Sequence, residues 1–211
     1  MDAHTFEAQR TCRLNYLLYL PEQSADAPLP LLLYLHGGGE SGQDLNLLKT
    51  RGLPRLLEQG RTLPFGVLAP QNPNPEQFFP EEAVFALIEE VITTYPVDAE
   101  RVYLTGFSRG GFAAWRMAMQ RPDLFAALFP VAAGGLVSYA FRVKEVPVWA
   151  FHGALDETIP LTLGVEMVDA LRAAGGDAKL TVFPEADHAN TLEQAYRHSD
   201  LYEWLLEQAK D

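Results

Sequence analysis

Short apolar runs alternate along the chain with longer segments that have helical spacing. The apolar runs are rich in Leu, Val, Tyr and Phe, as buried β-strands are. The expected strands are residues 14–20, 30–36, 65–69, 102–105, 126–132, 146–152 and 179–183. Between most of these strands, apolar residues recur every three or four positions, which is the period of an amphipathic helix. The expected helices are residues 44–59, 81–95, 110–121, 161–174 and 192–209.

From the third strand onward, the predicted strands and helices alternate. Continuous apolar strands interleaved with helices favour parallel pairing, because a parallel pair needs a crossover connection and the helices then cover both faces of the sheet. The pattern therefore predicts an α/β fold with a mostly parallel central sheet. The length of 211 residues fits one core of this kind, so we expect a single domain over residues 1–211.

The composition is that of a globular chain. Hydrophobic residues make up 48% and charged residues 21%, which excludes a disordered or collagen-like protein. The net charge of −12 is spread without long blocks of like charge, so nucleic acids and anionic membrane surfaces should be repelled. We therefore expect no nucleic-acid partner and no membrane partner.

The cysteine content and the length of the apolar runs indicate which cellular compartment and which metal sites the sequence allows. Cys12 is the single cysteine, so the sequence offers neither an internal disulfide nor a cysteine metal cluster. Residues 1–12 contain no apolar run behind a basic start, and the apolar runs 31–35 and 125–133 are far too short to span a membrane. We expect a cytoplasmic protein with no metal and no organic cofactor.

Candidate chemistry lies where the predicted strands end, because ligands of parallel α/β sheets bind outside the carboxyl ends of the strands. The pattern Gly106-x-Ser108-x-Gly110 stands between a predicted strand and a predicted helix. This is the context of a nucleophile elbow, in which the serine occupies a tight, strained turn that only small neighbours permit. Ser108 is therefore the candidate nucleophile.

A serine nucleophile needs two partners. A neutral imidazole must take the hydroxyl proton, and a carboxylate must orient that imidazole. In this fold the chain order is serine, acid, histidine, and His188 is the one histidine near the C-terminal end that also follows a predicted strand. Asp156 follows the strand 146–152 and is the expected acid, with Glu157 as the fallback.

The glycine-rich segment 37–42 matches two patterns. The first, G-x-G-x-x-G after a strand, is a dinucleotide fingerprint that requires an acidic residue at the end of the next strand. That strand is followed by Pro70-Gln71-Asn72, so the dinucleotide interpretation fails. The second is an oxyanion loop, in which glycines let backbone N–H groups approach a developing negative oxygen. The expected donors are the N–H groups of Gly38 and Arg109.

These motifs resemble the α/β-hydrolase superfamily over about residues 16–206. The segments that carry the resemblance are LHGGGESG at 35–42, VYLTGFSRGG at 102–111, FHGALD at 151–156 and DH at 187–188. They are similar to the phospholipase/carboxylesterase group, with its predicted-peptidase and feruloyl-esterase-like relatives. The resemblance implies an α/β-hydrolase fold and a triad of Ser108, Asp156 and His188. A methionine commonly follows the serine in that group, whereas Arg109 stands here and places a cation near the site. Dienelactone hydrolases resemble the chain less, because they use cysteine where Ser108 stands.

Other residues have structural or pocket interpretations. Phe78 and Phe79 follow a proline-rich segment and are candidates for lining an aromatic or acyl pocket, with a buried anchor for that loop as the alternative. Phe107 and Ile159 are pocket candidates because they flank the triad. The residues expected to serve packing, capping or solvation are His36 and His152 beside the strand ends, Trp115 in the core, Asp169 in a helix, Asp187 facing away or capping a turn, His198 on the surface of the last helix, and Trp204, Leu205 and Leu206 on its core face.

The sequence predicts a serine carboxylesterase that acts on small soluble esters. The connection at 134–145 has only about a dozen residues, too few for a separate helical lid, so we expect an open site. Thioester or amide cleavage by the same triad is the alternative, because the acyl-enzyme chemistry is shared. A hydrolase fold retained as a binding protein is a further alternative. The expected partner is a small-molecule ester.

Overall fold

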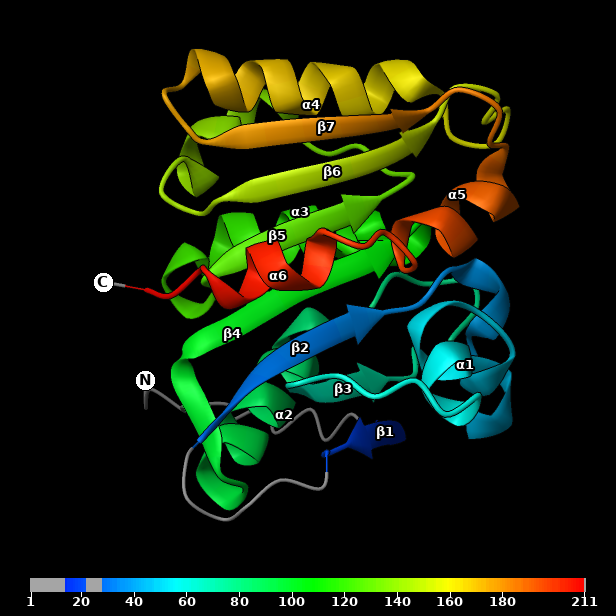
Figure 1. Ribbon diagram of the computed structural model, residues 1–211, viewed down its shortest axis with the longest axis vertical. Coiled ribbons are helices and arrows are strands. Elements are labelled where there is room, and N and C mark those ends of the chain that lie inside the picture. Colours follow the sequence, from blue (N-terminus) through cyan, green and yellow to red (C-terminus); the bar gives the residue numbers. More distant parts are fainter. Residues whose placement is uncertain (1–13, 22–27, 211) are drawn as a thin grey trace, which may run out of the picture.

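A seven-stranded sheet runs through the computed structural model, which describes residues 14–21 and 28–210 (Figure 1). The strand order is β1-β3-β2-β4-β5-β6-β7. Only β1 and β3 pair antiparallel, and all other neighbouring strands are parallel. The prediction of a mostly parallel α/β sheet is confirmed. The strands are β1 (Tyr16–Tyr19), β2 (Leu29–Leu35), β3 (Gly66–Pro70), β4 (Val97–Phe107), β5 (Ala127–Val131), β6 (Val148–Gly153) and β7 (Ala178–Phe183).

Helices cover both faces of this sheet (Figure 1). The helices of one face are α2 (Glu81–Thr94), α3 (Arg109–Gln120) and α4 (Leu161–Ala173), and those of the other are α1 (Gly52–Glu58), α5 (His188–Ala195) and α6 (Leu201–Leu206). Short 3₁₀ segments join them: η1 (Gly38–Glu40), η2 (Leu45–Thr50), η3 (Pro122–Leu124) and η4 (Val137–Val143).

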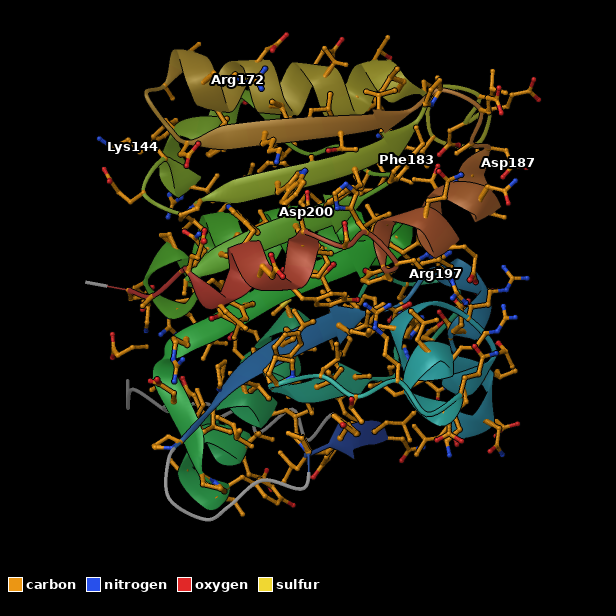
Figure 2. The ribbon with its side chains drawn as sticks, viewed as in Figure 1. Lys144, Arg172, Phe183, Asp187, Arg197 and Asp200 are labelled. Atoms are coloured by element: carbon orange, nitrogen blue, oxygen red, sulfur yellow. The ribbon has the colours of Figure 1, made fainter. Side chains whose placement is uncertain are left out.

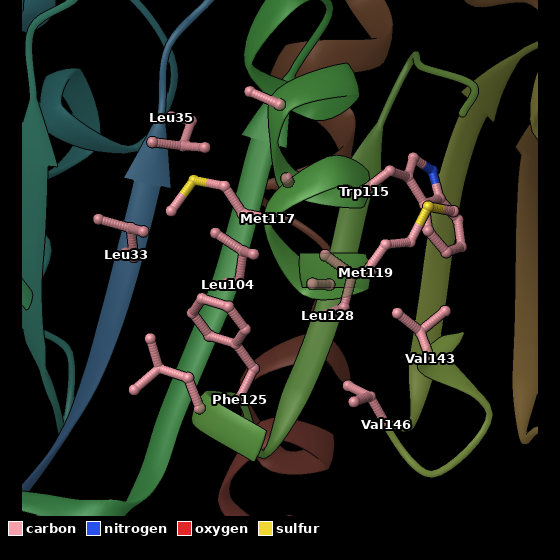
Figure 3. Close-up of a cluster of buried hydrophobic side chains, with 14 of the residues drawn as sticks. Leu33, Leu35, Leu104, Trp115, Met117, Met119, Phe125, Leu128, Val143 and Val146 are labelled. Carbon is pink, nitrogen blue, oxygen red and sulfur yellow. The ribbon is translucent and has the colours of Figure 1, made fainter. Parts of the chain in front are cut away.

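The two-residue period of the strands divides the core into two layers. On β2, Leu31, Leu33 and Leu35 face the α2–α4 side, where they join one cluster of buried apolar side chains. Leu32 and Tyr34 face the other side and join the second cluster. Figure 3 shows part of the first layer, with Leu33 and Leu35 beside the side chains of α3. Because both faces of the central strands are buried, they read in the sequence as continuous apolar runs.

The expected helix 44–59 is wrong in one respect, because it is interrupted in the middle. The 3₁₀ segment η2 ends at Thr50, and α1 begins at Gly52, whose φ of +57° lies in the left-handed region. A Cβ at Gly52 would lie 2.2 Å from the hydroxyl oxygen of Tyr34. This close approach to the sheet requires a glycine and bends the chain out of helical geometry.

The expected helix 192–209 is also wrong as a single element. It is two helices, α5 and α6, and of the residues between them Tyr196 is buried and His198 is half-buried. His198 lies in this break and packs on Trp149 and Phe151 at ring-centroid distances of 5.1 and 5.5 Å. The prediction that His198 is a solvated surface residue is therefore wrong.

The aromatic and leucine residues assigned to the core are mostly confirmed. Trp115 and Leu205 are fully buried, and Trp204 is partly buried against Trp149 at a centroid distance of 5.5 Å. Leu206 is 39% exposed, so its assignment to the core face is wrong. Cys12 lies outside the described residues.

The connection between β5 and β6 forms no separate cap. It contains η4, whose Ala140 and Val143 are buried in the core layer of α3 and α4. The prediction that this connection carries no large lid is thus confirmed. Within residues 14–21 and 28–210, no helix combines the length and the apolar character needed to cross a membrane.

Candidate active site

The turn between β4 and α3 is strained at Ser108. This residue has φ 52° and ψ −119°, a conformation that side-chain-bearing residues rarely adopt, and α3 begins at the next position. A Cβ at Gly106 would lie 2.2 Å from the carbonyl oxygen of Gly110, and a Cβ at Gly110 would lie 2.1 Å from that of Leu35. Both glycines are therefore required by close backbone contacts. The strain presents Ser108 at the carboxyl edge of the sheet, as in a nucleophile elbow.

An acid–base pair lies at the same edge of the sheet. Asp156 follows β6, and His188 begins α5 after β7. Nδ1 of His188 is 2.7 Å from Oδ2 of Asp156, and the Asp156 side chain has no exposed surface. The other carboxylate oxygen accepts hydrogen bonds from the backbone N–H groups of Thr158 and Ile159 at 3.0 and 2.8 Å. With both oxygens held, the carboxylate fixes the imidazole so that its Nε2 is the atom free to exchange a proton.

Phe107 connects Ser108 to His188, because it precedes Ser108 in the chain and its side chain contacts His188. Its ring packs against the ring of His188 at a centroid distance of 4.6 Å, and the next residue along the chain is Ser108. The Ser108 hydroxyl has no hydrogen-bond partner among the described residues. Catalytic hydrogen bonds are commonly long or misaligned until substrate binds.

The competing carboxylates have other partners. Asp187 caps the N-terminus of α5 by accepting a hydrogen bond from the N–H of Asn190 at 2.8 Å, and Figure 2 shows it at the start of that helix. This confirms its expected capping role. Glu157 is exposed, and Asp169 lies on α4 with Arg172 as its partner. Asp156 is the candidate that contacts His188.

The segment after β2 forms a tight turn beside the nucleophile. Gly38 begins the 3₁₀ segment η1, and a Cβ at the preceding Gly37 would lie 3.0 Å from the Phe107 ring. The guanidinium of Arg109 lies beside Gly38, 3.4 Å from where a Cβ of that residue would be. Neither the Gly38 N–H nor the Arg109 N–H has a backbone acceptor among residues 14–21 and 28–210. Amides in this position are available to stabilise a negative oxygen.

A family model described as Phospholipase/Carboxylesterase matches residues 69–199, which include the elbow, Asp156 and His188. The chain belongs to this family. A Nocardia uniformis subsp. tsuyamanensis protein named as an esterase, NocK, is 30% identical over 198 residues, which are 86% of this chain and 55% of that protein. A Yersinia pestis protein named as a carboxymethylenebutenolidase is 37% identical over 101 residues, 44% of this chain and 38% of that protein. The chain thus spans about half the length of these relatives or less.

Among solved structures, a thermostable esterase aligns with a TM-score of 0.80 and 30% identity over 93% of this chain and 60% of that one. A ferulic acid esterase aligns with a TM-score of 0.66 over 90% of this chain, and its 20% identity supports the fold alone. Both alignments include most of the sheet. The α/β-hydrolase fold is therefore shared along nearly the whole chain.

In this member of the phospholipase/carboxylesterase family, His36 holds the glycine-rich turn after β2 in place through hydrogen bonds. It is buried, its Nε2 accepts a hydrogen bond from the N–H of Asn72 at 2.9 Å, and its Nδ1 lies 2.5 Å from the carbonyl oxygen of Gly37. The ring therefore carries its proton on Nδ1. Burial lowers the pKa of His36 to about 4, and the nearby Arg109 acts in the same direction. His36 is a packing and hydrogen-bonding residue, as predicted.

We expect the stability of the protein to depend on His36 at acid pH. Its pKa falls from 6.5 in the unfolded chain to about 4 in the fold, so the unfolded state binds more protons between these values. The free energy of unfolding should fall by up to about 3 kcal/mol as the pH drops from about 6.5 to about 4. Urea unfolding at several pH values measures this loss.

The matched control for that experiment is His36→Gln, which does not titrate and whose amide oxygen can accept from Asn72. Burial raises the pKa of the neighbouring Glu40, so Glu40 contributes in the opposite direction. The difference between wild type and His36→Gln isolates the histidine. A difference that stays constant over this pH range would contradict the prediction.

His152 supports the acid in the same way that His36 supports the glycine turn. Its Nε2 lies 2.8 Å from the carbonyl oxygen of Ile159 and 3.7 Å from Oδ2 of Asp156. Burial lowers the pKa of His152, so the ring is held neutral and donates from Nε2. The ring fits because α4 has Gly164 at the contact: a Cβ there would lie 2.6 Å from Nδ1 of His152. Gly164 cannot be recognised as a site residue from the sequence, because an isolated glycine within a helical pattern gives no indication of which residue it contacts.

The four predicted pocket residues have different surroundings. Phe79 is 3% exposed and packs on His36 at a centroid distance of 4.9 Å, so it anchors the loop. Phe78 is 58% exposed, with the Arg116 guanidinium over its ring at 4.4 Å. Phe107 is buried under the His188 ring, and Ile159 is half-buried with its backbone held by Asp156 and His152. Of the four, Phe78 and Ile159 have side chains that reach solvent.

Proposed function

We propose that the protein is a serine hydrolase of carboxylic esters. The observation that carries this proposal is the buried Asp156 carboxylate held 2.7 Å from Nδ1 of His188, at the sheet edge where the strained Ser108 begins α3. The arrangement supplies a nucleophile, a base and an orienting acid in the order typical of the fold. Membership of the phospholipase/carboxylesterase family supports the same activity.

The mechanism follows from these positions. His188 Nε2 takes the proton of Ser108 as its oxygen attacks the ester carbonyl, and the backbone N–H groups of Gly38 and Arg109 donate to the resulting oxyanion. His188 then gives the proton to the leaving alcohol, which departs and leaves an acyl-enzyme. Water, deprotonated by His188, releases the acid and restores Ser108. Asp156 stabilises the imidazolium in both steps and remains ionised.

The substrates we propose are small soluble esters, because the described residues, 14–21 and 28–210, form no large lid that could enclose a long chain. We expect the highest kcat/KM for acyl chains of about two to six carbons, because each further methylene gains about 0.8 kcal/mol only while protein surface remains to bury it. Nitrophenyl esters of increasing chain length measure this. A preference for chains of about twelve carbons or more, or a jump in rate at the solubility limit, would instead make the loop at residues 70–80 a lid.

A fluorophosphonate probe tests the chemistry without knowledge of the substrate. In such a probe the oxygen of an activated serine attacks phosphorus and displaces fluoride, which leaves a phosphonylated serine, whereas an ordinary serine does not react. Labelling of wild type but not of Ser108→Ala supports the hydrolase, whereas absence of labelling in folded protein favours a binding protein. A feruloyl ester, an acyl thioester and an aminoacyl amide distinguish the ester reaction from the thioesterase and amidase alternatives. The acyl thioester is included because one relative, from Neurospora crassa, is named as acyl-protein thioesterase 1.

The proposed setting is the cytoplasm, with a small-molecule ester as the partner. The single cysteine suits a reducing compartment. The net charge of −12 disfavours nucleic acids and anionic membrane surfaces as partners.

A further inference from the structure

Arg109 carries a positive charge at an unfavourable place. It is the first residue of α3, where the helix dipole is positive and a cation is disfavoured. It is half-buried, and no carboxylate among residues 14–21 and 28–210 pairs with it. Arg116 on the same helix, by contrast, pairs with Glu81. Arg109 is thus a half-buried cation beside the nucleophile that a negatively charged ligand can pair with.

The orientation of the guanidinium leaves one of its edges free. Nη1 donates to the carbonyl oxygen of Pro75, in the loop that follows β3. The rest of the group lies beside Gly38, where an added Cβ would be 3.4 Å from Nη2 and 3.5 Å from Nε. Neither Nε nor Nη2 has an acceptor within the described part of the chain. This pair of N–H groups is the edge of arginine that binds a carboxylate with two parallel hydrogen bonds.

We propose that the Arg109 side chain is a specificity residue that binds a carboxylate carried by the ester substrate. The preferred substrates are then half-esters, in which one acid group is esterified and another is free. The side chain suits this role because its hydrogen bond to Pro75 fixes it, and because it lies beside Gly38 and belongs to the residue that follows Ser108. This proposal rests on the proposed esterase function, and it specifies in addition that the substrate carries a negative charge.

The test compares two esters of one skeleton, monomethyl glutarate, which is an anion at neutral pH, and dimethyl glutarate, which is neutral. The quantity measured in a pH-stat is the ratio of their kcat/KM values. We expect wild type to favour the anion, and Arg109→Met to lower the ratio about tenfold or more, as loss of a charge-assisted pair does. Arg109→Lys, which keeps the charge but not the two-pronged edge, should give an intermediate ratio.

Arg121→Met is the matched control, because it removes the same charge from the opposite end of α3. Its ratio should equal that of wild type. Raising the ionic strength from about 0.02 to about 0.5 M should lower the ratio in wild type more than in Arg109→Met, because salt screens the attraction. Glutarate should inhibit wild type competitively, with a Ki that rises about tenfold or more in Arg109→Met.

Several outcomes would overturn the proposal. An equal fall of all kcat/KM values in Arg109→Met, with an unchanged ratio both for the glutarates and for a second pair that carries the carboxylate on the alcohol side, would make the side chain only a support for the oxyanion turn. The same ratios in wild type, Arg109→Met and Arg109→Lys for both pairs would remove any role for it in selectivity. These results leave the esterase function intact, provided that hydrolysis of dimethyl glutarate depends on Ser108. Absence of hydrolysis of either ester by wild type, without labelling of Ser108, would refute the proposed function itself.

To cover ligands with the carboxylate on the alcohol side, butanoyloxyacetate and its methyl ester form a second matched pair. A fall of the ratio for the glutarates alone places the recognised carboxylate on the acyl part. A fall for the butanoyloxyacetates alone places it on the alcohol part. Both results support recognition of a substrate carboxylate by Arg109.

Discussion

Ser108→Ala should hydrolyse esters at least on the order of 10⁴-fold more slowly than wild type in kcat, because the substitution removes the attacking oxygen. The fold should be retained. The Ser108 hydroxyl has no hydrogen-bond partner among the described residues, so its loss leaves no donor or acceptor unpaired. Initial rates with a short-chain nitrophenyl ester measure the effect, and the melting temperature checks the fold.

Ser138→Ala is the control for Ser108→Ala, since Ser138 is an exposed serine of η4. It should keep the wild-type rate. If Ser108→Ala kept more than about 1% of the wild-type kcat, the loss would be far smaller than removal of a nucleophile causes. The nucleophile would then be another group.

Asp156→Asn is the substitution with the second largest expected effect, a fall of kcat on the order of 10⁴-fold. The asparagine is nearly the same size, but its amide can donate a hydrogen to Nδ1 of His188, which then carries its proton on Nε2. That tautomer cannot accept the proton of Ser108. The imidazolium formed in the reaction also loses the carboxylate that stabilises it.

The control for Asp156→Asn is the same substitution at Asp187, the neighbour of His188 in the sequence. Asp187 caps α5, and asparagine caps helices about as well as aspartate. Its kcat should therefore change little. The reverse order of effects would transfer the orienting role to Asp187, against the 2.7 Å contact between His188 and Asp156.

The ends of the predicted strands are where all the candidate catalytic residues lie in the sequence. The apolar runs are continuous because both faces of the sheet are covered, so the strands can be recognised in the sequence. The carboxyl ends of the parallel strands lie at one edge of the sheet. Ser108, Asp156 and His188 all follow such ends, and the structure places the last two in hydrogen-bonding contact. The requirement for glycine at positions 106 and 110 could also be predicted, because the motif itself demands small residues beside the serine, and the close backbone contacts agree with this.

Contacts between distant parts of the chain could not be predicted in the same way. The interruption at Gly52 depends on the Tyr34 hydroxyl, and the break at His198 depends on Trp149 and Phe151. Helical spacing continues across both breaks, so periodicity alone predicts one helix in each case. The position of the Arg109 side chain likewise depends on Pro75, which lies in a loop without periodicity.

His188, the candidate base, comes after β7, which lies at one edge of the sheet. β7 is the last strand in the order, it pairs on one side only among the described strands, and most of its residues are half-buried or exposed. Edge elements of this kind open at a lower free energy than the sheet centre, where Ser108 stands between β2 and β5. We therefore expect activity to be lost on warming before the fold is lost, because the contact between His188 and Asp156 can break while the central strands stay paired. To prolong the working life of the protein at high temperature, substitutions on β7 and α4 should help more than any change to the core.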